Sequence, residues 1–203
     1  MRGFSILEFL VASLLSMIVL MAVSSTYFTA RGLNKSANTR IGTQQDLRNA
    51  ANMIVRDARM AGNFGCFNMS NFPASAVIED KSSDEYTLKT AGVNKLLPVK
   101  EINKLGYASF AQTGKALLFQ YGIDKANPAA KTAIASSCFG IAKPQTEIKD
   151  LAAAKLALKI NDPDQDGSIA IMKHEMIAYA VGKLGEESGL FRFQLSNDGS
   201  WSN

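Results

Sequence analysis

The first thirty residues form an almost uninterrupted apolar run. From Phe9 to Ala30 no residue is charged, and the first proline of the chain is Pro73. At about 1.5 Å of rise per residue, a helix of this length covers the hydrocarbon core of a bilayer, which is about 30 Å thick. The pattern therefore predicts an N-terminal helix that can span a membrane.

The pattern then becomes amphipathic without a helix breaker. Apolar residues recur at steps of three and four from Leu33 to Ala58, which is typical of a helix with one apolar face. Gly62 supplies the expected stop. We expect one helix from about Phe4 to Met60, whose first half needs lipid or other helices around it and whose second half packs on a globular head.

Short strands are predicted beyond residue 62, in segments rich in aromatic or aliphatic residues. They are Tyr86–Leu88, Ala116–Tyr121, Thr132–Ser136, Met176–Val181 and Leu190–Leu195. A loop over Gly182–Gly189 is expected to join the last two strands as a hairpin. Asn197–Gly199 predicts a turn, which implies another strand after Trp201.

One further helix is predicted at about Glu147–Leu158, with Thr146 as its N-cap. A long helix followed by strands predicts an α+β fold, in which the helix packs on an antiparallel β-sheet. When the N-terminal apolar run is set aside, the rest of this 203-residue chain is long enough to form one domain.

The formal net charge of +4 is spread thinly, without a dense block of Lys or Arg. This distribution gives no support to direct nucleic-acid binding. The positive charges that do cluster, Arg48, Arg56 and Arg59, alternate with Asp46 and Asp57 on the predicted helix. We interpret them as a solvated helix face with salt bridges along it.

Glu8 is the one charged residue between Gly3 and Ala30. A carboxylate inside a membrane segment costs about 2–3 kcal/mol unless a partner neutralises it. A cleaved signal peptide would have a stronger basic start than Arg2 and a shorter apolar core, of roughly 7–15 residues. A plain single-pass anchor fits the length but leaves Glu8 unexplained. In a third interpretation, cleavage after Gly3 makes Phe4 the new N-terminus, and its ammonium group neutralises Glu8 of a neighbouring copy or partner.

The stretch Gly3-Phe4-Ser5-Ile6-Leu7-Glu8 resembles the processing motif of type IV pilins and pseudopilins. The resemblance implies that a prepilin peptidase cuts after Gly3, that Phe4 is then N-methylated, and that Glu8 guides helix docking in the filament. Residues 44–67, which contain "RDARMAG" before a "GC" turn, and residues 184–201 are similar to minor pilins of the PilW family, of the PilJ type. Members of this family usually continue with more strands after the position of Asn203, so a C-terminally truncated head is expected.

The resemblance implies a division of the chain into a leader peptide (1–3), a transmembrane and filament-core helix half (4–30), an amphipathic half that packs on the head (31–61) and an incomplete globular α+β pilin head (62–203). It implies a minor pilin that promotes pilus assembly within a type IV pilus or its initiation or tip complex. The alternatives are a pseudopilin of a type II secretion system and a single-pass membrane-anchored binding module.

The implied partners are other minor pilins, the major pilin, the prepilin peptidase and the inner-membrane assembly platform. Before assembly the chain would cross the inner membrane once with its head in the periplasm, and afterwards it would belong to the pilus at the cell surface. Adhesion, twitching motility and DNA uptake would follow indirectly.

Cys66 and Cys138 are the only cysteines. A head outside the cytoplasm meets an oxidising compartment, which favours a disulfide between them over the alternative of two unpaired buried thiols. Asp162, Asp164 and Asp166 have the alternate spacing of calcium loops before a glycine, but Lys173 stands where such a loop needs a bidentate Glu. We interpret this segment as an acidic surface turn and keep calcium binding as the less favoured alternative.

His174 is the sole histidine, and no Ser or Cys stands near it in a nucleophile context. We therefore expect a surface or strand-edge histidine. The sequence also lacks a glycine-rich phosphate loop with its Lys. We therefore predict that the chain is not an enzyme and that it has no cofactor.

Overall fold

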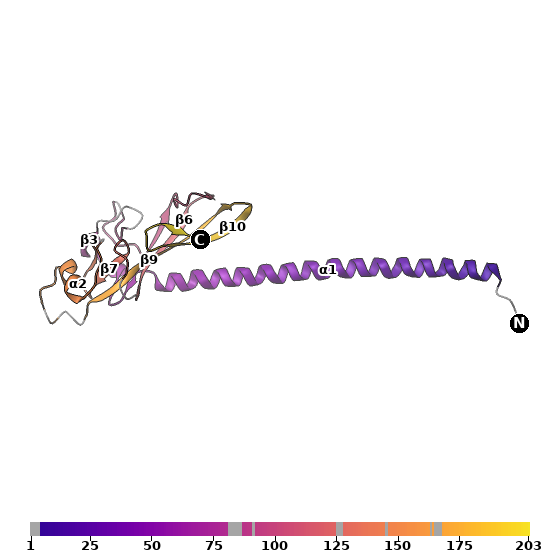
Figure 1. The fold of residues 1–203 in the computed structure, drawn as a ribbon, viewed down its shortest axis with the longest axis horizontal. Helices are drawn as coiled ribbons and strands as arrows, with labels where there is room; N and C mark the ends of the chain where they lie inside the picture. Colours follow the sequence, from indigo (N-terminus) through magenta and orange to yellow (C-terminus); the bar gives the residue numbers. More distant parts are fainter. Residues whose placement is uncertain are drawn as a thin grey trace. The chain divides into compact units, whose positions relative to one another are not determined.

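The structure is a computed structural model that describes residues 5–80, 87–90, 92–124, 128–144, 146–162, 164 and 168–203. The chain divides into two units, Met1–Ile54 and Val55–Asn203. Helix α1 (Ile6–Met60) runs through the first unit, and its last turns belong to the second unit, which holds the remaining described elements (Figure 1). The predicted long helix is confirmed, while Phe4, its expected first residue, lies outside the described residues.

A glycine turn follows the end of α1. Gly62 has a φ angle of +79°, which is the left-handed conformation that favours glycine. Its N–H donates to the carbonyl oxygen of Gln120 at 2.8 Å. A Cβ atom at Gly62 would lie 2.7 Å from Cβ of Pro98. Both the backbone conformation and the close approach therefore require glycine here.

A small hairpin comes next, formed by β1 (Asn63–Phe64) and β2 (Phe67–Asn68). Two 3₁₀ turns, η1 (Met69–Asn71) and η2 (Ala74–Ala76), then lead into the large sheet. Phe64, Phe67 and Met69 are fully buried in a core cluster with Ile134 and Ile141. The segment directly after α1 thus contributes its largest side chains to an apolar cluster that it shares with the sheet.

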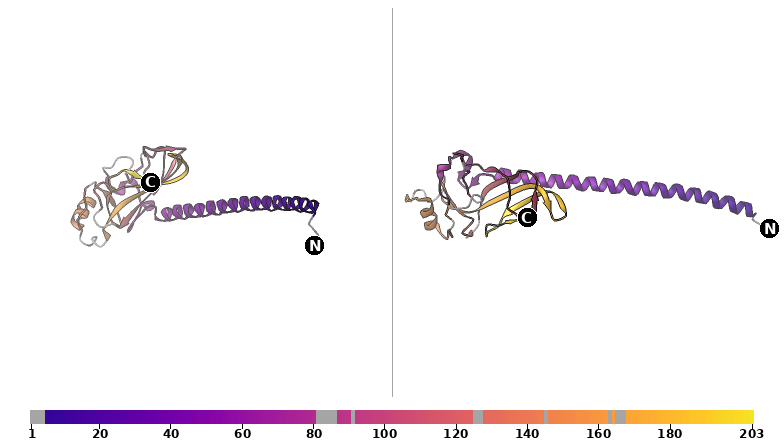
Figure 2. Two further views of the ribbon diagram at one scale, coloured as in Figure 1. Left: turned by 45° about the vertical axis from the view of Figure 1, so that its right-hand side comes forward. Right: turned by 90° about the horizontal axis from the view of Figure 1, so that it is seen from above.

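The large sheet has nine strands among the described residues. They are β3 (Val77–Asp80), β4 (Val99–Ile102), β5 (Phe110–Gln112), β6 (Ala116–Asp124), β7 (Ala133–Ser136), β8 (Ile141–Lys143), β9 (Ala170–Leu184), β10 (Glu187–Leu195) and β11 (Trp201–Ser202). The strand order is β11-β10-β9-β7-β8-β3. Strand β9 also pairs with β5 and with β6, and β6 in turn pairs with β4. The long β9–β10 hairpin is drawn in orange and yellow in Figure 2.

The sheet is mixed, and the prediction of an antiparallel sheet is wrong in this respect. Strands β3 and β8 pair in parallel, whereas the other strand pairs of the described sheet are antiparallel. A parallel pair needs a long crossover connection. The chain makes one here because β4 to β7 lie between β3 and β8 in the sequence. The coarser prediction, a long N-terminal helix with an α+β fold, is confirmed.

Strand register sorts the side chains of β6, β9 and β10 onto two faces, because directly paired residues point the same way. Leu118, Ala178 and Phe193 are paired across the three strands and share one face, which the segment with Leu105 and Tyr107 covers. On the opposite face Leu117, Tyr179 and Arg192 are paired in the same way. The first face is apolar around these three residues, whereas the second carries the polar cluster described below.

Helix α2 (Leu151–Leu158) is shorter than predicted and packs against β7, β8 and β3. Figure 1 shows it beside β7. Its N-cap is Asp150, whose Oδ1 accepts the N–H of Ala153 at 2.8 Å, so the prediction of Thr146 as the cap is wrong. Helix α2 begins later than the predicted Glu147, because Ile148 is buried outside the helix, in the cluster that contains Ala154 and Leu158.

Four predicted strands are confirmed as parts of β6, β7, β9 and β10. Thr87 and Leu88 are not in a strand, since Leu88 is buried at a bend and donates its N–H to the carboxylate of Asp80, and Tyr86 lies outside the described residues. The predicted hairpin between the last two strands is confirmed, but its loop is shorter than Gly182–Gly189, because pairing continues to Leu184 and Glu187. The predicted turn at Asn197–Gly199 is followed by β11, which begins at Trp201.

Candidate functional site

Ser5 and Glu8 form a capping-box arrangement at the start of α1. The N–H of Ser5 donates to Oε2 of Glu8 at 3.1 Å, and the N–H of Leu7 donates to Oγ of Ser5 at 3.3 Å. These bonds satisfy N–H groups that the first turn of a helix leaves without partners. The carboxylate also lies at the positive end of the helix dipole. This role was not predicted from the sequence, although the Ser-x-x-Glu spacing is its signal.

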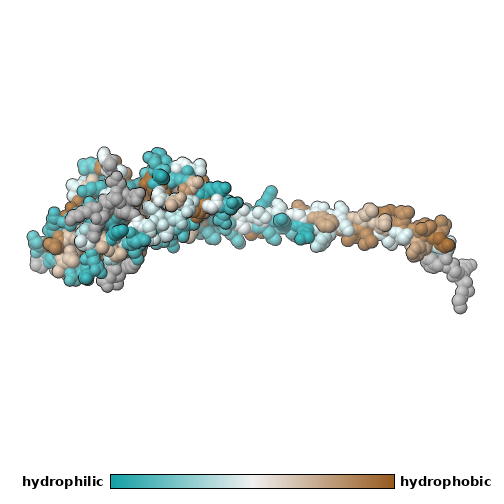
Figure 3. All heavy atoms as spheres, turned by 45° about the horizontal axis from the view of Figure 1, so that its top comes forward, coloured by the Kyte–Doolittle hydropathy of each residue, from teal (hydrophilic) through white to brown (hydrophobic). Residues whose placement is uncertain are grey.

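Gly3 and Phe4, the predicted processing residues, lie outside the described residues. Glu8 is described, and it is exposed on the first turn of α1. The apolar side chains that follow, such as Leu10, Leu14 and Ile18, are exposed within the first unit. Figure 3 shows hydrophobic side chains gathered over this part of α1. By length and composition, α1 qualifies as a helix that can cross a membrane.

Four hydroxyl groups in this apolar segment donate to carbonyl oxygens of the helix itself. Ser16 donates to the carbonyl oxygen of Ala12 at 2.8 Å, and Thr26 donates to that of Ala22 at 3.0 Å. Ser13 and Thr29 make bonds of the same kind. Because a bilayer interior offers no water to polar groups, internally bonded hydroxyls suit a lipid-facing helix.

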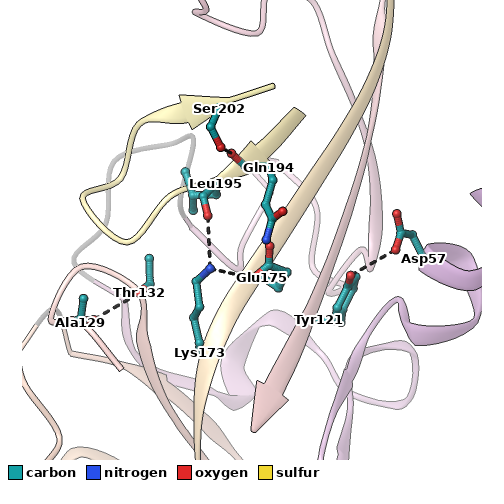
Figure 4. Close-up of polar contacts among 9 residues, drawn as sticks. All are labelled: Asp57, Tyr121, Ala129, Thr132, Lys173, Glu175, Gln194, Leu195 and Ser202. Atoms are coloured by element: carbon teal, nitrogen blue, oxygen red, sulfur yellow. Dashed lines mark hydrogen bonds and ion pairs between the residues drawn. The ribbon is translucent and has the colours of Figure 1, made fainter. Parts of the chain in front are cut away.

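Asp57 is the only residue of α1 that is buried, and it forms the centre of a polar cluster in the second unit. Its Oδ2 accepts the hydroxyl of Tyr179 at 2.7 Å and Nε–H of Arg192 at 3.1 Å. Its Oδ1 accepts the hydroxyl of Tyr121 at 3.2 Å, as the close-up in Figure 4 shows. The interpretation of Asp57 as part of a solvated face is therefore wrong, whereas Arg48, Arg56, Arg59 and Asp46 are exposed.

The cluster is built to hold Asp57 in its charged form. Burial alone would raise the pKa of its carboxyl group, but the hydrogen bonds from Tyr179 and Arg192 and the charge of Arg192 outweigh burial and hold the pKa below its usual range. Burial and the bond to Asp57 raise the pKa of Tyr179 to about 12. Both tyrosines therefore stay protonated donors at neutral pH, and the last turns of α1 are tied to β6, β9 and β10.

Lys173 and Glu175 on β9 form a second polar pair, also drawn in Figure 4. Nζ of Lys173 donates to Oε2 of Glu175 at 2.8 Å and to the carbonyl oxygen of Leu195 at 3.3 Å. The two side chains are only 8% and 2% exposed. Oε1 of Glu175 is buried and has no hydrogen-bond partner in the described part of the chain. The pair links β9 to the end of β10.

His174 points to the other face of β9 and is completely buried, so the prediction of a surface or strand-edge histidine is wrong. Its Nε2 lies 3.1 Å from Oε1 of Gln120, and its Nδ1 is buried without a partner among the described residues. Burial lowers the pKa of His174 well below its usual value, and the positive charges of Lys143, Lys100 and Lys173 lower it further. The ring is therefore neutral in the folded protein.

Cys66 and Cys138 form a disulfide across a sequence separation of 72 residues. Cys66 lies in the β1–β2 turn and Cys138 between β7 and β8, so the bond ties the segment after α1 to the large sheet.

In the acidic segment, Oδ1 of Asp162 accepts the N–H of Asp164 at 3.0 Å, and Asp166 lies outside the described residues. Within the described ranges, no three His, Cys, Asp or Glu side chains are grouped as a metal site.

The geometry thus brings together residues that the sequence pattern did not connect. Asp57, Tyr121, Tyr179 and Arg192 meet at one point. Glu8 lies near the other end of helix α1, where it caps the helix. Hydrogen bonds and charge hold the groups in place at both positions.

Compared with models of known families, with curated proteins and with solved structures, the chain has no match.

Proposed function

We propose that the chain is a minor pilin, a non-enzymatic filament subunit that inserts through its N-terminal helix into a type IV pilus or its initiation or tip complex and promotes assembly. The observation that carries the proposal is Glu8, a single carboxylate on the first turn of a helix that stays uncharged up to Ala30. Gly3 and Phe4 stand where pilin-type processing would cut the chain and expose an amine.

The physical reason is the cost of a lone anion in an apolar environment. A carboxylate in lipid, or in a bundle of apolar helices, is tolerated when a positive charge or hydrogen-bond donors accompany it. The N–H of Ser5 supplies one donor, and a free amine at Phe4 would supply a full charge. In a filament, the amine of one subunit would meet Glu8 of the next, so processing and docking would depend on each other.

The second unit supports the proposal in a general way. A disulfide-bonded α+β unit that holds the last turns of the same helix through Asp57 suits a head outside the cytoplasm. We extend the proposal to a pilin-type head, periplasmic before assembly and on the pilus afterwards. The proposed partners are the major pilin, other minor pilins, the prepilin peptidase and the inner-membrane assembly platform.

Glu8→Gln and Glu8→Ala test the proposal together. Glutamine can take the place of glutamate in a capping box, so Glu8→Gln keeps the helix cap and removes only the charge, whereas Glu8→Ala removes both. We expect both variants to reach the membrane fraction normally and to lose about tenfold or more of their incorporation into sheared surface fibres. Ser13→Ala, in the same apolar segment, should behave like the unmodified chain.

Normal incorporation of Glu8→Gln would show that the charge is dispensable and would contradict the proposal. A pseudopilin of a type II secretion system would share the same N-terminal chemistry. Deletion of the gene separates the two, since a minor pilin affects the number of surface fibres and a pseudopilin affects secretion.

A further inference from the structure

A pocket opens on the apolar face of the large sheet in the second unit. Its volume is about 170 Å³. Leu118 of β6 and Met176 of β9 form its floor, and Ile102 of β4, Leu105 and Trp201 of β11 contribute its apolar walls. The pocket therefore lies on this face of the sheet, with β4 paired to β6 on one side and β11 paired to β10 on the other.

The size of the pocket suits a small hydrocarbon group. An engineered apolar cavity of about 150 Å³ binds benzene, so this volume admits a ring or a short alkyl chain. Leu118 and Met176 are 2% and 1% exposed and make a dry floor. The flexible thioether of Met176 adapts to ligands of different shape, and the indole of Trp201 offers a large rigid wall.

Two positive side chains complete the lining. Lys104 is exposed, whereas Lys100 is held in place because its Nζ donates to the carbonyl oxygens of Thr87 and Lys89, at 3.0 and 2.9 Å. An ammonium group has three N–H donors, and these two carbonyl oxygens take two of them. Burial lowers the pKa of Lys100 to about 8, against the opposing effect of Asp80, and the group is still charged at neutral pH.

We propose that this pocket binds a small carboxylate with an apolar body of about six carbon atoms. The hydrocarbon part would lie on Leu118, Met176 and Trp201, and the carboxylate would face Lys100 and Lys104. A neutral hydrocarbon of equal size would fill the volume but would give the ammonium of Lys100 no acceptor. A carboxylate adds a charge-assisted hydrogen bond in a partly desolvated site. This inference does not depend on the filament function.

The fluorescence of Trp201, the only tryptophan of the chain, gives a direct test. The full chain in a nonionic detergent is titrated with hexanoate and, separately, with hexanamide, a neutral molecule of the same length. We expect a saturable fluorescence change with hexanoate and an affinity for hexanamide that is about tenfold weaker. Equal affinities would overturn the role of the lysines, and a change that does not saturate would report partitioning into the micelle and overturn the pocket.

Variants locate the binding. Lys100→Gln should weaken hexanoate binding about tenfold and Lys104→Gln about threefold, because Lys104 is screened by solvent. Ile102→Phe fills the pocket and should abolish binding. Lys115→Gln is the matched control, since Lys115 pairs with Glu101 at 2.6 Å and is not part of the lining.

If Lys115→Gln weakens binding as much as Lys104→Gln, the effect is one of net charge and the proposal is wrong. Unchanged binding by Ile102→Phe would also overturn it. The thermal unfolding of each variant is measured first. Should Lys100→Gln fail to fold, Lys104→Gln, at an exposed position, and Ile102→Phe decide the outcome.

Discussion

The hydroxyl of Tyr179 donates to Oδ2 of Asp57 at 2.7 Å, across 122 residues of sequence. This bond joins the centre of β9 to the last turns of α1 within the second unit. Arg192 on β10 binds the same oxygen atom, and Tyr121 on β6 binds the other. Asp57 is therefore the point at which three strands and the helix end are held together by a single carboxylate.

Asp57→Asn is expected to destabilise the second unit by about 2 kcal/mol, because hydrogen bonds to a charged group are lost and Arg192 keeps no full counter-charge. Asp46→Asn makes the same change at an exposed position of the same helix and should change the free energy of unfolding by less than about 0.5 kcal/mol. Urea unfolding of the full chain in nonionic detergent, followed by Trp201 fluorescence, measures both. Equal stability of the two variants would contradict the role given to Asp57.

Stability should fall when the pH drops below about 6.5, the usual pKa of histidine. The folded state keeps His174 neutral because its pKa is lowered, while the unfolded chain takes up a proton, so stability is present above this pH and is lost as the pH falls. Gln120 and Phe64 contact the ring, and Lys143, Lys100 and Lys173 oppose its charge.

The measurement compares the melting temperature of the unmodified chain and of His174→Gln between pH 7 and pH 5. The melting temperature of His174→Gln should fall less than that of the unmodified chain over this range. Asp57 does not interfere, because its lowered pKa places its own loss of stability below about pH 4. Parallel curves for the two proteins would show that His174 does not control the acid sensitivity.

Reduction of the disulfide should lower the free energy of unfolding by roughly 4 kcal/mol, the loop-closure value for a bridge of this span. The bridge spans 72 residues between Cys66 and Cys138. Urea unfolding with and without a reducing agent measures the effect. The double variant Cys66→Ala, Cys138→Ala serves as the control and should be insensitive to the reducing agent; a reductant effect of the same size in this variant would refute the assignment.

Gly182 and Gly189 face each other across the β9–β10 hairpin but differ in their surroundings. A Cβ atom at Gly182 would clash with the carbonyl oxygen of Ala111 and lie 2.5 Å from Cζ of Phe110, whereas nothing lies within 4 Å of a Cβ at Gly189. Gly182→Ala should therefore cost about 1–3 kcal/mol through overpacking. Gly189→Ala should change the free energy of unfolding by less than about 1 kcal/mol. Urea unfolding of both variants measures the two effects. Equal losses of stability in the two variants would contradict the close approach of β5 to Gly182.

Local sequence patterns predicted the elements whose formation depends on their own residues. The apolar repeat predicted α1, and the aromatic and aliphatic segments predicted the middle of β6, β7, β9 and β10. The strand ends and the α2 cap were wrong because tertiary contacts set them. Both Thr146 and Asp150 are good N-cap residues, and the burial of Ile148 outside the helix decides between them.

The polar cluster could not be predicted for the same reason. On the helix pattern Asp57 stands beside the exposed Arg56, and its partners lie 64, 122 and 135 residues away in the sequence. The parallel pairing of β3 and β8 also depends on a crossover that no local pattern reveals. The Ser5–Glu8 cap, in contrast, was visible in the sequence as Ser-x-x-Glu and required only that the helix begin at Ile6.

Mass spectrometry of the chain purified from its natural membrane or surface fibres tests the central proposal most directly. The account predicts an N-terminal peptide that lacks Met1 to Gly3 and begins with a methylated Phe4. A chain that keeps Met1, Arg2 and Gly3 would have no amine at Phe4 to neutralise Glu8, and the proposed filament subunit would be contradicted.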